Sequence, residues 1–114
     1  MSDKELLEDA AKAAGIEVWW NGRTCFVLKT KVTTHEWNPL TFDADALRLA
    51  VKLGLAISID AVERETWAHH DQVILGSREW WSAHPTTEHG NEDMYAATRR
   101  AIVRAAAEIG RLQQ

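Results

Sequence analysis

The spacing of apolar residues predicts a helix at each end of the chain. In residues 3–14, apolar side chains recur at intervals of three and four, which is the period of one helix face. Ser2 and Glu5 form the pattern of a capping box at the start of this helix, and Gly15 suits a left-handed C-cap. Residues 92–112 are rich in alanine and show the same period, so they are expected to form the last helix. The apolar stripe expected on it comprises Met94, Thr98, Ala101, Ile102, Ala105 and Ile109.

The segment after the first helix has the pattern of a β-hairpin. Asn21 and Gly22 separate residues 17–20 from residues 23–28, two runs rich in β-forming side chains. A type I′ turn needs positive φ at both central positions, which Asn and Gly tolerate. We therefore expect two antiparallel strands, with the second ending between residues 29 and 31.

A middle helix is predicted over residues 44–53, preceded by an extended turn. Pro39 disfavours the helical conformation at Asn38, so the helix is expected to begin after this point. Asp43 is the expected cap of this helix, and Gly54 is expected to end it. The residues expected on its inner face are Leu47, Ala50, Val51 and Gly54. The residues expected to point to water are Asp45, Arg48 and Lys52.

Strand signals return after the middle helix. Residues 55–60 alternate as in a half-buried strand, and β-forming residues recur at 73–75 and 79–81. Residues 61–72 either extend the preceding strand or form a loop, and residues 83–91 are polar, as loops are. The predicted element order is therefore α-β-β-α-β-β-α. This order indicates an α+β fold in which helices pack on a mainly antiparallel sheet.

Composition and charge exclude several classes of protein. The chain has 114 residues, a length that suits a single domain over residues 1–114. Its formal net charge of −4 argues against general nucleic-acid binding, and residues 57–93 carry eight acids against two arginines. The single cysteine, Cys25, excludes a disulfide within the chain and a cysteine-based zinc site. Because neither a membrane span of about 20 apolar residues nor a signal-peptide pattern occurs, we expect a cytoplasmic protein without membrane contact.

Three segments resemble one family of small proteins encoded by tailed phages and prophages. Residues 37–53 (WNPLTFDADALRLAVKL) look like its central motif, and residues 97–111 (ATRRAIVRAAAEIGR) are similar to its closing helix. Residues 5–15 (ELLEDAAKAAG) fit its first helix. The wider group resembles the phage ABA-sandwich domain, which implies an antiparallel sheet between helices. The resemblance also implies an accessory protein that acts in the host cell against bacterial defence, and residues 58–91 lie outside the shared pattern.

Tryptophans are the first candidate contact residues, because the chain contains six of them. Trp37 either offers its ring to a base or packs the turn onto the core. Trp19 and Trp20 are adjacent in a predicted strand, as are Trp80 and Trp81. Neighbouring side chains in a strand point to opposite faces, so each pair sends one indole away from the core. Such an indole lies under a helix, at the surface or against a partner.

Arginines are the second kind of candidate. Arg100, Arg104 and Arg111 form a basic stripe on one side of the last helix, where they either pair with phosphates or carboxylates or form a solvated face. Arg78 and Trp80 share one face if residues 73–82 form a strand. An arginine beside an indole can hold a phosphate or a carboxylate while the ring covers a base or an apolar side chain. In the alternative, that face is core and Arg78 only lies along its edge.

No catalytic or metal-binding arrangement stands out in the sequence. The five histidines lack metal-site spacing, the serines lack a nucleophile elbow, and no glycine-rich phosphate loop occurs. Cys25 lies in a strand pattern, where a buried and inert thiol is expected. We therefore predict no metal, no cofactor and no enzymatic activity.

Two non-enzymatic functions are favoured over an enzyme that acts on a nucleotide. The first is a sponge that sequesters a nucleotide second messenger of host immunity. The alternative is a protein-binding inhibitor of a host defence complex such as a CRISPR effector, because the acidic region would suit a basic groove. We also expect a homo-oligomer, most simply a two-fold dimer, because a small sheet with surplus indole needs cover. The predicted ligand- or partner-binding residues are Trp37, Trp67, Arg78, Trp80, Trp81, Arg100 and Arg104.

Overall fold

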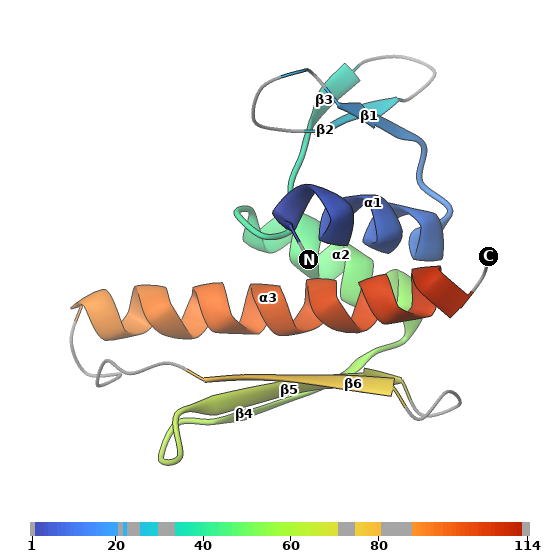
Figure 1. The fold of residues 1–114 in the computed structure, drawn as a ribbon. Helices are drawn as coiled ribbons and strands as arrows, with labels where there is room; N and C mark the ends of the chain where they lie inside the picture. Colours follow the sequence, from blue (N-terminus) through green and yellow to red (C-terminus); the bar gives the residue numbers. More distant parts are fainter. Residues whose placement is uncertain are drawn as a thin grey trace.

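In the part of the chain that the structure describes, three helices lie between two small antiparallel sheets (Figure 1). The structure is a computed structural model that describes residues 2–20, 22, 26–29, 34–70, 75–80 and 88–112. Its helices are α1 (Asp3–Ala14), α2 (Asp43–Leu53) and α3 (Glu88–Leu112). Sheet A comprises β1 (Val18–Trp20), β2 (Phe26–Lys29) and β3 (Thr34–Trp37). Sheet B comprises β4 (Ala56–Asp60), β5 (Glu65–His70) and β6 (Leu75–Trp80).

The α+β class and the antiparallel pairing predicted from the sequence are confirmed. The described order has one more strand in each half, because β3 and β5 form where the sequence predicted a polar turn and an extension or loop. Both strands are rich in polar residues, which weakens their apolar alternation. The layers also differ from the implied sandwich, because α1, α2 and α3 lie between the sheets and not outside one sheet (Figure 1).

The register of sheet A brings three aromatic residues into one row that faces the helices. Trp20 is opposite Phe26, and Phe26 is opposite Trp37 on the next strand. The Trp20 and Phe26 rings meet edge to face, with their centroids 5.0 Å apart. The predicted antiparallel pairing of the two strands is thereby confirmed. Trp20 pairs with Phe26, whereas a two-residue turn at Asn-Gly would pair it with Arg23, and residues 21 and 23–25 lie outside the described part of the chain.

Helix α3 is the central layer, and its contact with α1 is unusually close. It packs against α1 and α2 on one side and against β5 and β6 on the other. A Cβ added at Gly110 would lie 1.9 Å from the backbone oxygen of Asp9 in α1, so only glycine fits there. The predicted caps of α1 are confirmed, since Ser2 accepts a hydrogen bond from the Glu5 amide and Gly15 adopts the left-handed conformation. Besides Gly110, the buried residues among the described part of α3 are Ala97, Ala101, Ile102, Val103, Ala105, Ala106 and Ala107.

The turn before α2 forms as predicted, but neither of two aspartates has its expected role. Asp45 was expected in water, yet it is buried and its carboxylate accepts a hydrogen bond from the Asn38 amide at 2.9 Å. Asp43 is not the cap, because Phe42 occupies that position without a side-chain hydrogen bond. Asn38 in turn accepts from the Leu40 amide at 3.0 Å, which tightens the segment around Pro39.

The rotation of α2 also differs from the prediction. Leu47 is 62% exposed and Val51 is 72% exposed, although both were expected on the inner face. The buried apolar side chains are those of Ala46, Leu49 and Ala50. Apolar residues occur on two sides of this helix, so periodicity alone does not decide which side faces the core. The hydrogen bond from Asn38 to Asp45 turns that residue inward, together with its neighbour Ala46.

Helix α3 begins at Glu88, earlier than the predicted residue 92. The loop expected over residues 83–91 therefore ends sooner than predicted, and residues 81–87 lie outside the described part of the chain. Within the described residues, no helix combines the length and the apolar character that crossing a membrane requires.

Candidate functional site

The outer face of sheet B carries most of the predicted contact positions. Thr66 and Ala68 of β5 are fully buried on the face that packs against α3. Trp67 lies between them in sequence, so it belongs to the opposite face. No described helix lies on that face (Figure 1). The alternation of β5 therefore presents Trp67 on a side of the sheet that the described fold does not need for its core.

The register of β5 with β6 brings the predicted residues into neighbouring positions. Arg78 is directly opposite Trp67, and Trp80 is opposite Glu65. The prediction that Arg78 and Trp80 occupy one face of a strand is thus confirmed for their backbone positions. Their side chains, and Trp81 as a whole, lie outside the described part of the structure. Trp67 itself is half-buried, and its indole N–H donates a hydrogen bond to the Glu65 carboxylate at 3.3 Å.

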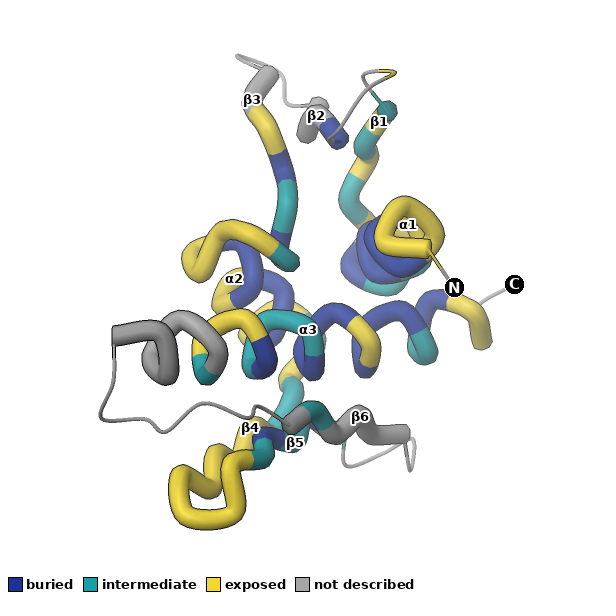
Figure 2. Tube along the Cα trace, turned by 60° about the vertical axis from the view of Figure 1, so that its left-hand side comes forward, coloured by how far each residue is buried: buried dark blue, intermediate teal, exposed yellow. Residues whose placement is uncertain are grey.

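An acidic hairpin projects beside this face. The turn between β4 and β5 is closed by the Asp60 carboxylate, which accepts hydrogen bonds from the amides of Val62 and Glu63 at 3.0 and 3.1 Å. Arg64 adopts a φ of 55°, a left-handed conformation that turns the chain into β5. The hairpin extends away from the helices and its turn is exposed throughout (Figure 2). Asp60 and Glu63 therefore stand in water next to the face that carries Trp67.

The arginines of α3 hold elements of the fold together. Arg100 pairs with Asp3 of α1 at 3.1 Å, and Arg104 pairs with Glu79 of β6. Both side chains are nonetheless partly exposed. The basic stripe predicted on this helix is therefore neutralised by carboxylates of the chain itself, and neither arginine lies beside an exposed indole in the described residues.

Trp37 requires a correction, because the structure places it in the core. Its residue exposure is only 3%, and it packs beside the equally buried Phe26 in the row that faces the helices. The indole therefore has no free face for a base, and the alternative of packing the turn onto the core holds. The neighbouring pair Trp19 and Trp20 behaves as alternation predicts, since Trp20 is half-buried and Trp19 is exposed on the opposite face.

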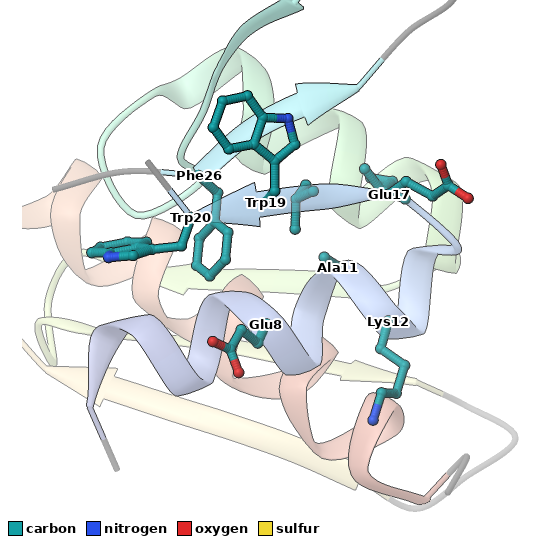
Figure 3. A pocket seen from close by; sticks show the side chains of 9 residues that line it. Glu8, Ala11, Lys12, Glu17, Trp19, Trp20 and Phe26 are labelled. Carbon is teal, nitrogen blue, oxygen red and sulfur yellow. The ribbon is translucent and has the colours of Figure 1, made fainter. Parts of the chain in front are cut away.

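A groove of about 570 Å³ runs between α1 and β1 (Figure 3). Phe26 points from the sheet toward α1, whereas Trp19 lies on the other side of β1. The charged residues that line the groove are Glu8, Lys12 and Glu17, and Lys4 beside it pairs with Glu8 at 3.5 Å and lies over the Trp20 ring. The two lysines are balanced by the two glutamates, so the groove has no excess positive charge to attract a phosphate.

A second groove, of about 440 Å³, lies between α2, β4 and α3, and the sequence did not predict it. Leu47 of α2 and Ile57 and Ile59 of β4 line it and are exposed. Among its described lining residues the charged ones are Asp43 and Arg99, which form an ion pair with each other at 2.7 Å. This lining is therefore apolar and electrically balanced. The sequence signal that points to it is the second apolar side of α2, which exceeds what a single buried face needs.

The described residues show no group of three or more His, Cys, Asp or Glu side chains placed to hold a metal ion. His69 and His70 occupy opposite faces of β5, as adjacent strand residues must. Comparison of the chain with models of protein families, with curated proteins and with solved structures finds no significant match.

Proposed function

We propose that this chain is a non-enzymatic, phage-type protein that binds and blocks a bacterial defence protein in the host cytoplasm. The contact surface is the outer face of sheet B together with the acidic hairpin at Asp60 and Glu63. The phage setting rests on the resemblance of the first helix, the central motif and the closing helix. The choice of a protein partner rests on the geometry of sheet B.

A single observation carries this proposal: Trp67 occupies the face of sheet B away from α3, beside a projecting hairpin with exposed carboxylates. Tryptophan is enriched among the residues that dominate protein interfaces. Exposed carboxylates at the edge of such a contact accelerate encounter with a basic partner and discriminate against acidic ones. A defence protein with a basic nucleic-acid groove has the matching charge.

A nucleotide sponge is the second candidate, and one observation favours it. The register places Arg78 directly opposite Trp67, so a base and a phosphate have potential contacts on neighbouring strands. Two other observations weigh against it as the first choice. Arg100 and Arg104 are paired with carboxylates, and Trp37 is buried, so these residues do not converge on an anion.

Native mass spectrometry of the tagged protein purified from a defence-active bacterial host tests both candidates. We expect a complex with one host protein, weakened about 30-fold or more by Trp67→Ala, which corresponds to a loss of about 2 kcal/mol. The matched control is Trp19→Ala, which removes an exposed strand indole from sheet A. A retained nucleotide that Trp67→Ala releases would favour the sponge instead, and a protein that carries neither would contradict both.

Charge reversal provides an independent test of the acidic hairpin. Glu63→Lys should slow association with the captured protein and reduce its dependence on salt, because rim charges act mainly on the encounter rate. Glu36→Lys is the control, since Glu36 is an exposed acid on β3 of the other sheet. Equal effects of the two substitutions would show that only net charge matters and would contradict a site at this hairpin.

A further inference from the structure

We propose that a second copy of this chain docks along β4, so that the two sheets B join edge to edge and fill each other's apolar grooves. The inference concerns the face of sheet B that is turned toward α3, so it goes beyond the proposed function and does not rest on it.

The first observation is that β4 is an edge strand with apolar side chains on its inner side. It pairs with β5, and no other described strand lies along its second edge. Ile57 is opposite Ala68 and Ile59 is opposite Thr66, so both isoleucines share the face that packs against α3. Helix α3, however, packs over β5 and β6, and Ile59 is left 53% exposed.

The second observation is that the open edge of β4 and the apolar groove adjoin each other. Ile57 and Ile59 form one wall of the groove, and Leu47 of α2 forms the facing wall. A strand added beside β4 would direct every second side chain into this space, because alternate residues of a strand share a face. The groove therefore fits an added strand with apolar residues at alternate positions.

The strand with the required pattern is β4 itself. It reads Ala-Ile-Ser-Ile-Asp, with isoleucines at positions 57 and 59 and serine between them. A two-fold axis at Ser58 pairs all five residues of one copy with all five of the other, and it places Ile57 opposite the partner copy's Ile59. This antiparallel register sends four isoleucines toward the grooves and keeps both serines on the outer face. A contact of this kind is self-complementary, as a two-fold interface requires.

Charge does not oppose this register. Asp60 is the only ionised residue of β4, and the register places it opposite Ala56 of the partner copy. The two Asp60 residues then lie four positions apart, roughly 14 Å at about 3.4 Å per residue. That separation exceeds the Debye length of about 8 Å at physiological ionic strength, so their repulsion is largely screened.

The size of the interface decides which other residues must take part. A stable dimer buries about 800 Å² on each partner, roughly a ninth of the 7095 Å² surface of this chain. Five paired residues alone are too few for such an area, so the groove walls must contribute. Leu47 and Tyr95 line the groove and are exposed, and Val51 is exposed one turn after Leu47 in α2. These side chains supply that apolar surface. The result is one six-stranded sheet whose outer face carries both copies of Trp67.

Sedimentation over a micromolar concentration range tests the dimer. We expect wild-type protein at twice the 12.9 kDa mass of one chain. Ile59→Lys should return it to a single chain with unchanged far-ultraviolet circular dichroism, because a lysine on an edge strand opposes pairing. Val62→Lys, on the exposed turn of the same hairpin, should leave the dimer intact. Wild-type protein that sediments at 12.9 kDa throughout, or a dimer that survives Ile59→Lys, would overturn the proposal.

Cysteine cross-linking tests the register. In a Cys25→Ser background, Ser58→Cys should form a disulfide-linked dimer, since directly opposite strand residues have Cα atoms about 4.5 to 5.5 Å apart. Asp60→Cys should not cross-link, because its two copies are too far apart in the same register. Cross-linking of the Asp60→Cys variant but not of the Ser58→Cys variant would overturn this arrangement. If the wild-type protein is monomeric and Ile59→Lys abolishes its binding to a captured host protein, the groove is the site for that protein. This result would also overturn the dimer proposal.

The two proposals fail separately. Trp67→Ala should leave the dimer mass unchanged while it weakens partner binding, because Trp67 lies on the outer face. Conversely, the wild-type protein could be monomeric and still lose its partner on Trp67→Ala substitution. This result would support the proposed function and contradict the dimer.

Discussion

The contact between α1 and α3 and the groove between α2, β4 and α3 use apolar residues in opposite ways. The first is built from alanines and from Gly110, and the helices approach until a single added carbon would meet the Asp9 carbonyl. The second is lined by the larger side chains of Leu47, Ile57 and Ile59, which remain exposed. Small residues thus permit close approach at the helix contact, whereas several large apolar residues of the groove remain at the surface.

This difference indicates that close approach of backbones contributes to the centre of the molecule, beside larger buried side chains such as Leu7, Leu49 and Val103. Alanines bury little area each, but tight packing gives their backbones many dispersion contacts. Exposed large apolar residues have no such role in the described fold. Their presence in one groove is therefore better explained by a partner than by folding.

The largest effect expected is that of removing the one large side chain of α2 that is fully buried. Leu49 is 1% exposed, so Leu49→Ala should lower the free energy of unfolding by about 2–5 kcal/mol. Leu47→Ala, two residues away in the same helix, should change it by less than about 0.5 kcal/mol. Urea unfolding in the Ile59→Lys background measures both without a contribution from association. Equal losses of stability in the two variants would show that Leu47 belongs to the core, and would contradict the difference between the two regions.

The next effect concerns the close helix contact. Gly110→Ala should lower the free energy of unfolding by about 1–3 kcal/mol. The new Cβ forces α1 and α3 apart, and the cost of this separation exceeds the gain in helix propensity. Arg111→Ala is the control, since the neighbouring side chain is partly exposed and pairs with Glu108 of its own helix. Thermal unfolding of both variants gives the comparison. A stabilised Gly110→Ala protein would refute the close approach.

A smaller effect is expected at Arg99, which lines the groove and links α3 to the start of α2. Its Nε donates to the Leu40 carbonyl at 2.8 Å, and its guanidinium also pairs with Asp43. Arg99→Ala should cost about 1–2 kcal/mol, because it leaves a half-buried carbonyl without this donor. Asp43→Ala should cost less, at most about 1 kcal/mol, because that carboxylate is largely exposed. Equal costs in urea unfolding would indicate that the ion pair carries the whole contribution.

The smallest effect is expected at Val51, which is exposed one turn after the groove residue Leu47 in α2. Val51→Lys should change monomer stability by no more than about 0.5 kcal/mol, since the side chain is already mostly in water. The same substitution should weaken the dimer in sedimentation at micromolar concentration. Unfolding at a markedly lower urea concentration would instead show that Val51 contributes to the core.

The elements with complete local signals could be predicted from the sequence. The caps of α1 at Ser2 and Gly15 and the antiparallel pairing of β1 with β2 depend on neighbouring residues, and they are confirmed. Strand β5 could not be predicted, because its sequence Glu-Thr-Trp-Ala-His-His gains its pattern only when α3 buries Thr66 and Ala68. The rotation of α2 depends likewise on a hydrogen bond between Asn38 and Asp45 that periodicity does not contain.

The candidate site could be predicted only as far as local strand alternation determines it. Alternation alone places Arg78 and Trp80 on one face, and the register adds Trp67 beside them. The burial of Trp37 and the partners of Arg100 and Arg104 depend on long-range packing, so the sequence left both alternatives open. The contact role of the outer face remains a prediction.

The central position of α3 has a consequence for biosynthesis. Gly110 contacts Asp9 across about one hundred residues of chain, and α3 follows every other described element in sequence. Non-local contacts of this kind are slow to form, because a long loop must close before they stabilise anything. While the ribosome is still extending the chain, the sides of α1 and β5 that α3 covers in the folded protein remain exposed. A nascent chain stalled before α3 would therefore be a substrate for chaperones and proteases.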